Sequence, residues 1–178
     1  MLVIIGNIVG LLASIVMAYS GIFKNKKTML FIQCIEKVLL VISNILLNGI
    51  SGAIVNTISF VRNLLCYKDK LNLVLKIILT LISIPVTIYF NNRGLIGLLP
   101  LIAGISFIWF MTVKDVKKFK LLIIVTTVLW SIYNFYIQSY VTFVFEVLTI
   151  ITNIISIIML GKKKVKKWDL EIIRMLKV

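Results

Sequence analysis

The sequence predicts an all-α protein that crosses a membrane seven times, and three observations carry this prediction. First, 61% of the 178 residues are hydrophobic and 15% are charged, whereas soluble domains average about 45–50% and about 25%. Second, the mean hydropathy is +1.10. Third, charged residues gather in short breaks between apolar stretches of about 20 residues, the length that spans a bilayer. This composition rules out a disordered chain and argues against a soluble globule.

The apolar stretches are bounded by charged or amide residues. The first begins at Met1 without a preceding basic segment, the reverse of a signal peptide, and this suits a helix that enters with its N-terminus outside. The third and seventh stretches are short and polar, so six or five spans stay open as alternatives. The predicted spans are residues 2–22, 28–47, 50–67, 72–90, 95–113, 120–138 and 140–160.

The connections alternate between basic and nearly uncharged segments. Residues 24–27, 68–70 and 114–120 are rich in lysine, whereas residues 48–49 and 138–139 carry no charge. Lysine and arginine concentrate in cytoplasmic loops, so we predict an outside N-terminus, an inside C-terminus and Arg93 as the only external basic residue. The external loops are too short to form a domain, so function must reside among the helices or at the cytoplasmic rim.

The C-terminal segment 161–178 is strongly basic and contributes to a formal net charge of +14. Its lysines precede Trp168 and a run with one apolar side. This pattern predicts a short amphipathic helix on the anionic inner leaflet rather than a nucleic-acid site. The lysines expected to contact anionic lipid are Lys162, Lys163, Lys164, Lys166 and Lys167.

An internal repeat appears when the chain is shifted by 90 residues against itself. Asn44 then meets Asn134, and Asn63 meets Asn153. The repeat predicts two parallel triple-helix bundles joined by a linker helix, an arrangement of three, one and three helices. The expected units are residues 1–70, 71–92, 93–160 and the tail 161–178. Small transporters use parallel repeats with a site at the repeat interface, but a duplicated structural bundle would give the same repeat.

Polar side chains at membrane depth usually face the bundle interior. The second, third, sixth and seventh stretches each carry a polar face at helical spacing, so four faces could line one cavity. We therefore expect the third and seventh helices to be neighbours, with Asn56 and Glu146 converging. The candidate solute-binding residues are Asn56, Asn63, Trp130, Asn134, Glu146 and Asn153.

Four charged residues lie deepest in the predicted spans: Glu36, Lys37, Arg62 and Glu146. An unpaired charge at that depth costs at least about 2.5–3.5 kcal/mol. One interpretation is two structural pairs, Glu36 with Arg62 and Lys37 with Glu146. The other makes Glu146 a substrate or proton site whose ion pair opens on binding.

Enzymatic chemistry has little support. The chain contains no histidine, and its two cysteines, Cys34 and Cys66, lack the spacing of a metal or redox motif. Apart from Glu36 and Glu146, the sequence offers no pair of acidic residues that would suit aspartyl-type or glycosyl hydrolysis. We therefore expect neither an enzyme nor a metal or other cofactor.

Two family resemblances become visible on these residues. The run Trp130-Ser131-Ile132-Tyr133-Asn134, followed by Glu146, resembles SWEET, SemiSWEET and PQ-loop carriers. More closely, Gln33, Asn44, Gly49, Gly52, Asn56 and the Arg62-Asn63 pair resemble the bacterial inner-membrane protein YgjV family, over about residues 2–160.

The SWEET resemblance implies a central site between the third helices of both halves, with Asn56 and Glu146 at the asparagine-type positions and Trp130 as an aromatic wall. Glu146 replaces the expected amide and no Pro-Gln dipeptide occurs, which argues against a neutral sugar. The YgjV resemblance implies the bacterial inner membrane and no established activity. Our first hypothesis is a small-solute carrier; the alternative is a non-transporting membrane subunit or assembly protein.

Overall fold

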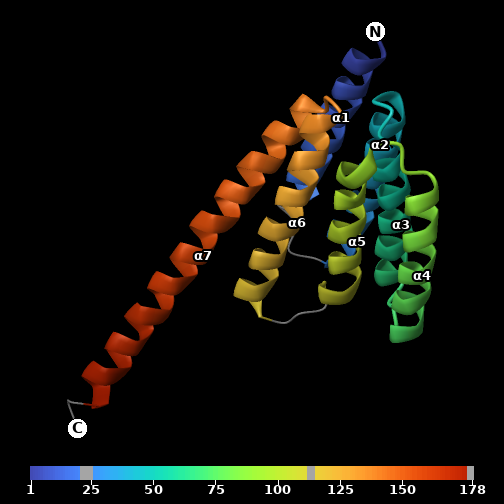
Figure 1. Cartoon of the computed structure of the whole chain (residues 1–178). Coiled ribbons are helices and arrows are strands. Elements are labelled where there is room, and N and C mark those ends of the chain that lie inside the picture. Colours follow the sequence, from blue (N-terminus) through green and yellow to red (C-terminus); the bar gives the residue numbers. More distant parts are fainter. Residues whose placement is uncertain (21–25, 112–114, 176–178) are drawn as a thin grey trace.

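The computed structural model describes residues 1–20, 26–111 and 115–175, without the side chains of residues 20, 26, 116 and 160–175. Every regular element in these ranges is helical, which confirms the all-α class. The helices are α1 (Leu2–Ser20), α2 (Lys26–Leu46), α3 (Ile50–Tyr67), α4 (Leu73–Tyr89), the 3₁₀ turn η1 (Gly94–Leu98), α5 (Leu99–Phe110), α6 (Val116–Tyr136) and α7 (Tyr140–Met175). Helices α2 to α5 run up and down along nearly one direction, and α7 runs obliquely to them (Figure 1).

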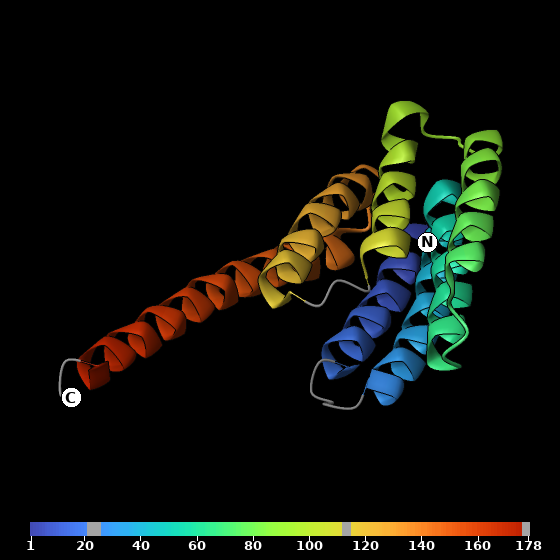
Figure 2. The same ribbon diagram turned by 90° about the horizontal axis from the view of Figure 1, so that it is seen from below.

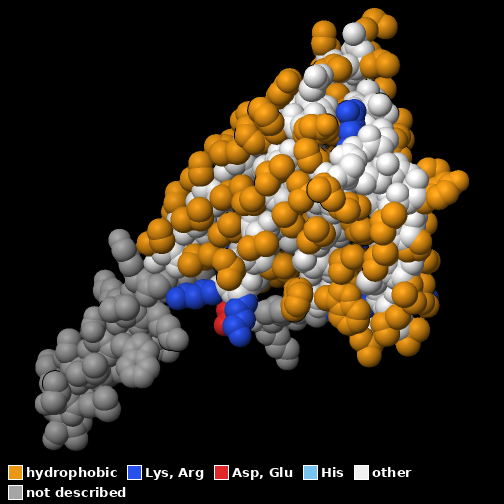
Figure 3. All heavy atoms as spheres, in the orientation of Figure 1, with side chains coloured by type: hydrophobic (Ala, Val, Ile, Leu, Met, Phe, Trp, Pro, Cys, Tyr) orange, Lys and Arg blue, Asp and Glu red, His pale blue; other side chains and the backbone are white. Residues whose placement is uncertain are grey.

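The face of the molecule seen in Figure 3 is apolar over most of its height. In the part of the chain that the structure describes, four helices are long and apolar enough to cross a membrane: Leu2–Tyr19, Lys27–Leu46, Lys117–Tyr136 and Tyr140–Met159. The α4 helix and the η1–α5 segment are apolar but shorter. The α3 helix contains more polar side chains, including Asn56, Arg62 and Asn63. These side chains are buried inside the bundle.

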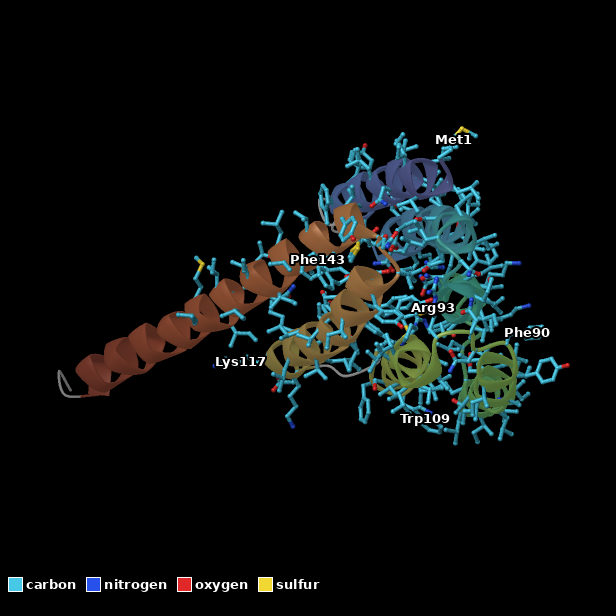
Figure 4. The ribbon with its side chains drawn as sticks, turned by 45° about the horizontal axis from the view of Figure 1, so that its top comes forward. Met1, Phe90, Arg93, Trp109, Lys117 and Phe143 are labelled. Carbon is cyan, nitrogen blue, oxygen red and sulfur yellow. The ribbon has the colours of Figure 1, made fainter. Side chains whose placement is uncertain are left out.

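Six helices pack in a closed series: α1 on α2, α2 on α3, α3 on α5, α5 on α6, α6 on α7, and α7 on α1. The α4 helix stands outside this ring against α3 and α5, and Phe90, at its C-terminal end, lies on the side away from the ring (Figure 4). The predicted contact between the third and seventh helices is wrong, because α3 and α7 form no extended contact in the described residues. Their longest interfaces are with α2 and α6, the helices that precede them.

The helices α2–α3 and α6–α7 correspond position by position at the predicted offset of 90 residues. Lys26–Leu46 corresponds to Val116–Tyr136, and the following helices begin at Ile50 and Tyr140. Both turns are built alike. Asn48 and Gln138 take the left-handed conformation, with φ of 55° and 64°, and each next residue donates its amide hydrogen to the carbonyl of an asparagine, Asn44 or Asn134. This is the geometry that commonly ends a helix.

Two predicted helix limits differ from the structure. The span predicted over 95–113 is divided into the η1 turn and a 12-residue α5, because Pro100 is favourable only near a helix start. The tail predicted as a separate helix over 161–178 continues α7 without a break as far as Met175 (Figure 2). The lysine side chains of that segment lie outside the described residues.

Candidate functional site

The inner face of α3 holds two buried asparagines. Asn56 is 1% exposed, and neither its amide nitrogen nor its carbonyl oxygen has a hydrogen-bond partner among the described residues. Asn63, two turns further along, accepts hydrogen bonds from Arg62 Nε and Nη2 at 3.2 and 3.0 Å, but its own amide nitrogen is unpaired. Because buried polar groups are nearly always satisfied, α3 presents unused hydrogen-bonding capacity to the bundle interior.

The first turn of α3 is held by a tyrosine from α6. Tyr133 is fully buried, and its hydroxyl oxygen accepts the amide hydrogen of Gly52 at 2.9 Å. A Cβ atom on Gly52 would lie 2.6 Å from the Tyr133 ring and 2.6 Å from Asn44 Oδ1, and one on Gly49 would lie 2.7 Å from the tyrosine oxygen. Two glycines at the start of α3 are thus required by the close approach of α6. The two glycines, Gly49 and Gly52, were the sequence signal that could have indicated this close contact. Tyr133 itself was not among the predicted site residues.

An apolar cluster lies next to this contact, at the end of the bundle that carries the short uncharged turns. Leu47, Tyr133 and Ile137 are buried in it, and Trp130 packs against them. The Trp130 and Tyr133 rings meet edge to face with centroids 6.0 Å apart. Trp130, predicted as an aromatic wall, is half-buried in this cluster. The cluster closes the space between α2 and α6 at that end.

Arg93 spans the same end of the bundle (Figure 4). Its guanidinium donates to the carbonyl oxygens of Asn48 and Leu47 at 3.3 and 3.4 Å. Its Cζ lies 5.9 Å from the centre of the Tyr136 ring. Asn92 also donates to the Asn48 carbonyl at 2.9 Å. The loop after α4 therefore ties the last carbonyls of α2 to the last turn of α6.

Glu146 of α7 binds α6. Its Oε1 accepts a hydrogen bond from Asn134 Nδ2 at 2.8 Å. Its Oε2 is buried without a partner, and so is the hydroxyl of Ser131, the neighbouring α6 side chain that interacts with the carboxyl group. Glu146 thus has one good donor and no cation in contact.

The remaining deep charges are paired differently from the prediction. Lys37 Nζ lies 2.9 Å from Glu36 Oε1. Arg62 contacts Asn63 and lies 5.4 Å from the centre of the Phe107 ring. Both predicted ion pairs, Glu36 with Arg62 and Lys37 with Glu146, are therefore wrong as direct contacts. A flexible lysine can fold back onto its neighbour, whereas a planar guanidinium stacks on an aromatic ring. Each predicted pair still interacts at longer range.

The predicted site residues thus form separate groups rather than one ring. Asn134 and Glu146 contact each other, as do Arg62 and Asn63. Asn153 only donates to the Thr149 carbonyl of its own helix and is half-buried. Asn56 and Glu146 stand on α3 and α7, which do not pack together. The intervening contacts run from α3 through Tyr133 to Asn134 on α6.

Two hollows lie between helices, and neither is lined by Asn56 or Glu146. One, of about 10 Å³, is enclosed by α3, α4 and α5 and includes Ser59 and Ser83. The other, of about 190 Å³, is an apolar groove between α2 and α3 beside Phe31 and Tyr67.

A family model matches residues 4–164 of the chain: Imp-YgjV, described as bacterial inner membrane protein. No curated protein and no solved structure matches the chain.

Proposed function

This chain belongs to the Imp-YgjV family of bacterial inner membrane proteins, and we propose that it is a carrier that moves a small polar solute across that membrane. The predicted family and location are confirmed. The observation that carries the proposal is Asn56, whose carboxamide is buried with both polar atoms unpaired. Such an atom costs about 1–3 kcal/mol, a cost that is offset when a solute hydrogen-bonds to it.

The proposed architecture is two parallel triple-helix bundles, residues 1–70 and 93–160, joined by a linker helix over residues 71–92. The matching turns after α2 and α6 support this arrangement, and so does the ring order, in which α3 on α5 corresponds to α7 on α1. The linker α4 crosses once, so both bundles would point the same way, as in transporters with parallel repeats.

The proposed orientation has the N-terminus outside and the C-terminus inside. The α3–α4 connection, the start of α6 and the C-terminal end of α7 lie at one end of the bundle (Figure 1), while Arg93 bonds the α2–α3 turn at the opposite end. Excess lysine favours the cytoplasmic side.

The two ends of the bundle differ in a way that supports alternating access. At the proposed external end, the cluster of Leu47, Tyr133 and Ile137 is sealed by Arg93. Toward the other end, α7 leans away from the bundle (Figure 2). Each of its residues from 143 to 159 is at least partly exposed, although the carboxylate oxygen Oε2 of Glu146 is buried. A carrier closed toward the outside would have this asymmetry, and solute would reach the site after the helices part.

The proposed solute-binding residues are Asn56, Asn63, Trp130, Asn134, Glu146 and Asn153. The carboxamide of Asn56 supplies both a hydrogen-bond donor and an acceptor, and Trp130 would offer an apolar face to the solute. Asn134 and Glu146 would exchange their mutual hydrogen bond for solute contacts. Carboxylate and amide groups fit a polar solute better than an apolar one.

A non-transporting subunit is the rival function, and the closed packing around Asn56 favours it. The two functions differ in whether Asn56 is ever reached by water. In proteoliposomes made with a variant lacking Cys34 and Cys66, Asn56→Cys should react with a small, membrane-impermeant thiol reagent. The matched control is Ser83→Cys, because Ser83 is equally buried but stands on α4 outside the ring. Equal inertness of both positions from either side would overturn the carrier proposal.

Uptake completes the test. Proteoliposomes would be offered radiolabelled glucose, glutamine and putrescine, which represent neutral, zwitterionic and cationic solutes. We expect uptake of at least one that Asn56→Ala reduces at least tenfold, because a polar solute would lose both of its contacts to that carboxamide.

The lysine-rich end of α7 is proposed to hold anionic lipid headgroups at residues 162–164 and 166–167. Each lysine near an anionic leaflet contributes about 1 kcal/mol of attraction. Binding to vesicles that contain phosphatidylglycerol, compared with neutral vesicles, tests this contact.

A further inference from the structure

Glu146 differs from the other buried acid in what surrounds it. Glu36 has Lys37 at 2.9 Å and Arg62 within electrostatic range. Glu146 has no cation in contact, because Lys37 has folded onto Glu36. In an apolar interior, a carboxylate without a contacting cation is expensive. Among the described residues, Glu36 therefore has a compensating cation, and the carboxylate of Glu146 does not.

The charges around Glu146 come from one helix only. The side chains of α2 contribute Glu36 and Lys37. The packed α1 carries no charged residue, and α6 contributes Ser131 and Asn134, with its lysines 117, 118 and 120 confined to its first turns. On α7 itself, residues 140–159 include no other charged side chain. Nothing else among the described residues can neutralise this carboxylate.

The carboxyl group of Glu146 has one oxygen that is free to bind a proton. Oε1 already accepts from Asn134, so the free position is Oε2. A proton there would convert Oε2 into a donor toward the adjacent Ser131 hydroxyl, which can accept or donate a hydrogen bond. When Glu146 is ionised, Ser131 can donate to Oε2, but the negative charge stays without a contacting cation. One bound proton removes that charge and still allows Oε2 and Ser131 to pair.

We propose that Glu146 is a proton-binding site and that the proton is the coupling ion of the carrier. This inference rests on the proposed function and names its coupling ion. When the proton leaves, the carboxylate attracts Lys37 away from Glu36, so gain and loss of the proton change the contacts between α2 and α7. A proton needs no solute-sized cavity, and neither the hollow between α3, α4 and α5 nor the groove between α2 and α3 is lined by Glu146.

Infrared spectroscopy of the reconstituted full-length protein tests proton binding without knowledge of the solute. A protonated carboxylic acid has a C=O stretch that a carboxylate lacks. The wild-type protein should show this band within about pH 5 to 8, the range in which biological proton switches work. Glu146→Gln should abolish the band, and Gln can still accept from Asn134, so the fold is retained. Glu36→Gln should keep it, and Ser131→Ala should shift its frequency.

Coupling is tested by the fluorescence of Trp130 after Trp109→Phe and Trp168→Phe. Its emission should change over the same pH range as the infrared band, and Glu146→Gln should remove the change. An absent band, or a band that survives Glu146→Gln, overturns the proton site. A band without any fluorescence change overturns its role as coupling ion. Neither result depends on solute uptake or Asn56→Cys labelling, which test the carrier proposal separately.

Discussion

The hydroxyl oxygen of Tyr133 accepts the amide hydrogen of Gly52 at 2.9 Å, so a side chain of α6 caps the first turn of α3 across 81 residues of sequence. The first amides of a helix have no partner within it. Here the missing partner comes from the other half of the chain, beside the apolar cluster at the end of the bundle. This contact links the two halves directly.

Tyr133→Phe should destabilise the protein by about 1–3 kcal/mol, because the Gly52 amide would be left buried and unsatisfied. Thermal unfolding in detergent measures the loss. Tyr136→Phe is the matched control, since Tyr136 lies one turn away, is exposed, and keeps its ring over Arg93. Equal effects of both variants would contradict the capping role.

Lys37→Met should destabilise the protein by up to about 3–5 kcal/mol, because it leaves Glu36 buried without its contacting cation. Adding Glu36→Gln should restore most of that stability. Adding Glu146→Gln should restore less, because Glu146 does not contact Lys37. Chemical denaturation of the three variants measures the difference, and stronger rescue by the change at position 146 would refute the pairing seen in the structure.

Asp115 should make the start of α6 sensitive to acid. Its Oδ1 accepts the amide hydrogens of Lys117 and Lys118 at 2.8 and 3.1 Å, and these bonds lower the pKa of the carboxyl group below its usual value. Because the pKa of Asp115 is lower in the folded protein, its carboxylate stabilises the folded form at pH values above the pKa of the unfolded state. That stabilisation is lost as the pH falls through the pKa of the folded state. The protection of the Lys117 and Lys118 amides against exchange, relative to the intrinsic rate at each pH, should therefore fall in acid. Asp115→Asn should remove this dependence, because an amide still caps but does not ionise in this range.

A cysteine at Asn92 should react with an impermeant reagent added outside, and one at Lys117 should not, in a background without Cys34 and Cys66. Asn92 is exposed, whereas the neighbouring Asn91 is half-buried and bonds the Gly94 carbonyl. Labelling of intact cells compared with broken cells gives the answer. The opposite pattern would reverse the proposed orientation.

Arg93→Ala should loosen the closed end, because it removes the contacts to the carbonyls of Leu47 and Asn48 and to the Tyr136 ring. We expect faster labelling of Asn56→Cys from outside, by several-fold. Arg93→Lys should give an intermediate rate, since lysine retains the charge without the planar fork. Unchanged labelling in both variants would show that Arg93 does not seal that end.

The sequence was sufficient to locate the helices and the repeat. Apolar runs between lysines identify seven stretches because bilayer thickness fixes their length, and matching amides revealed the offset of 90 because amides are rare in apolar helices. The turns at Asn48 and Gln138 now give that offset a structural basis. The site residues Asn56 and Glu146 were chosen for polarity at depth, and both lie inside the bundle.

Partners within the bundle could not be predicted in the same way. A helical wheel gives the face of Lys37 but not the rotamer that turns its amine to Glu36 rather than Glu146. The neighbours of α3 and α7 depend on how whole helices pack, which a single polar face does not specify. The importance of Tyr133 depended on a glycine 81 residues away, a distance over which local periodicity carries no information.

The unbroken α7 has a mechanical consequence. Its 36 residues measure about 54 Å at 1.5 Å per residue, against about 30 Å of hydrocarbon. A straight helix of that length is a lever with its fulcrum in the bilayer. A small change of tilt at the proposed proton site, where Glu146 meets α6, would be magnified at the far tip. The proposal therefore expects protonation of a single carboxyl group in the membrane to displace the C-terminal end of the helix.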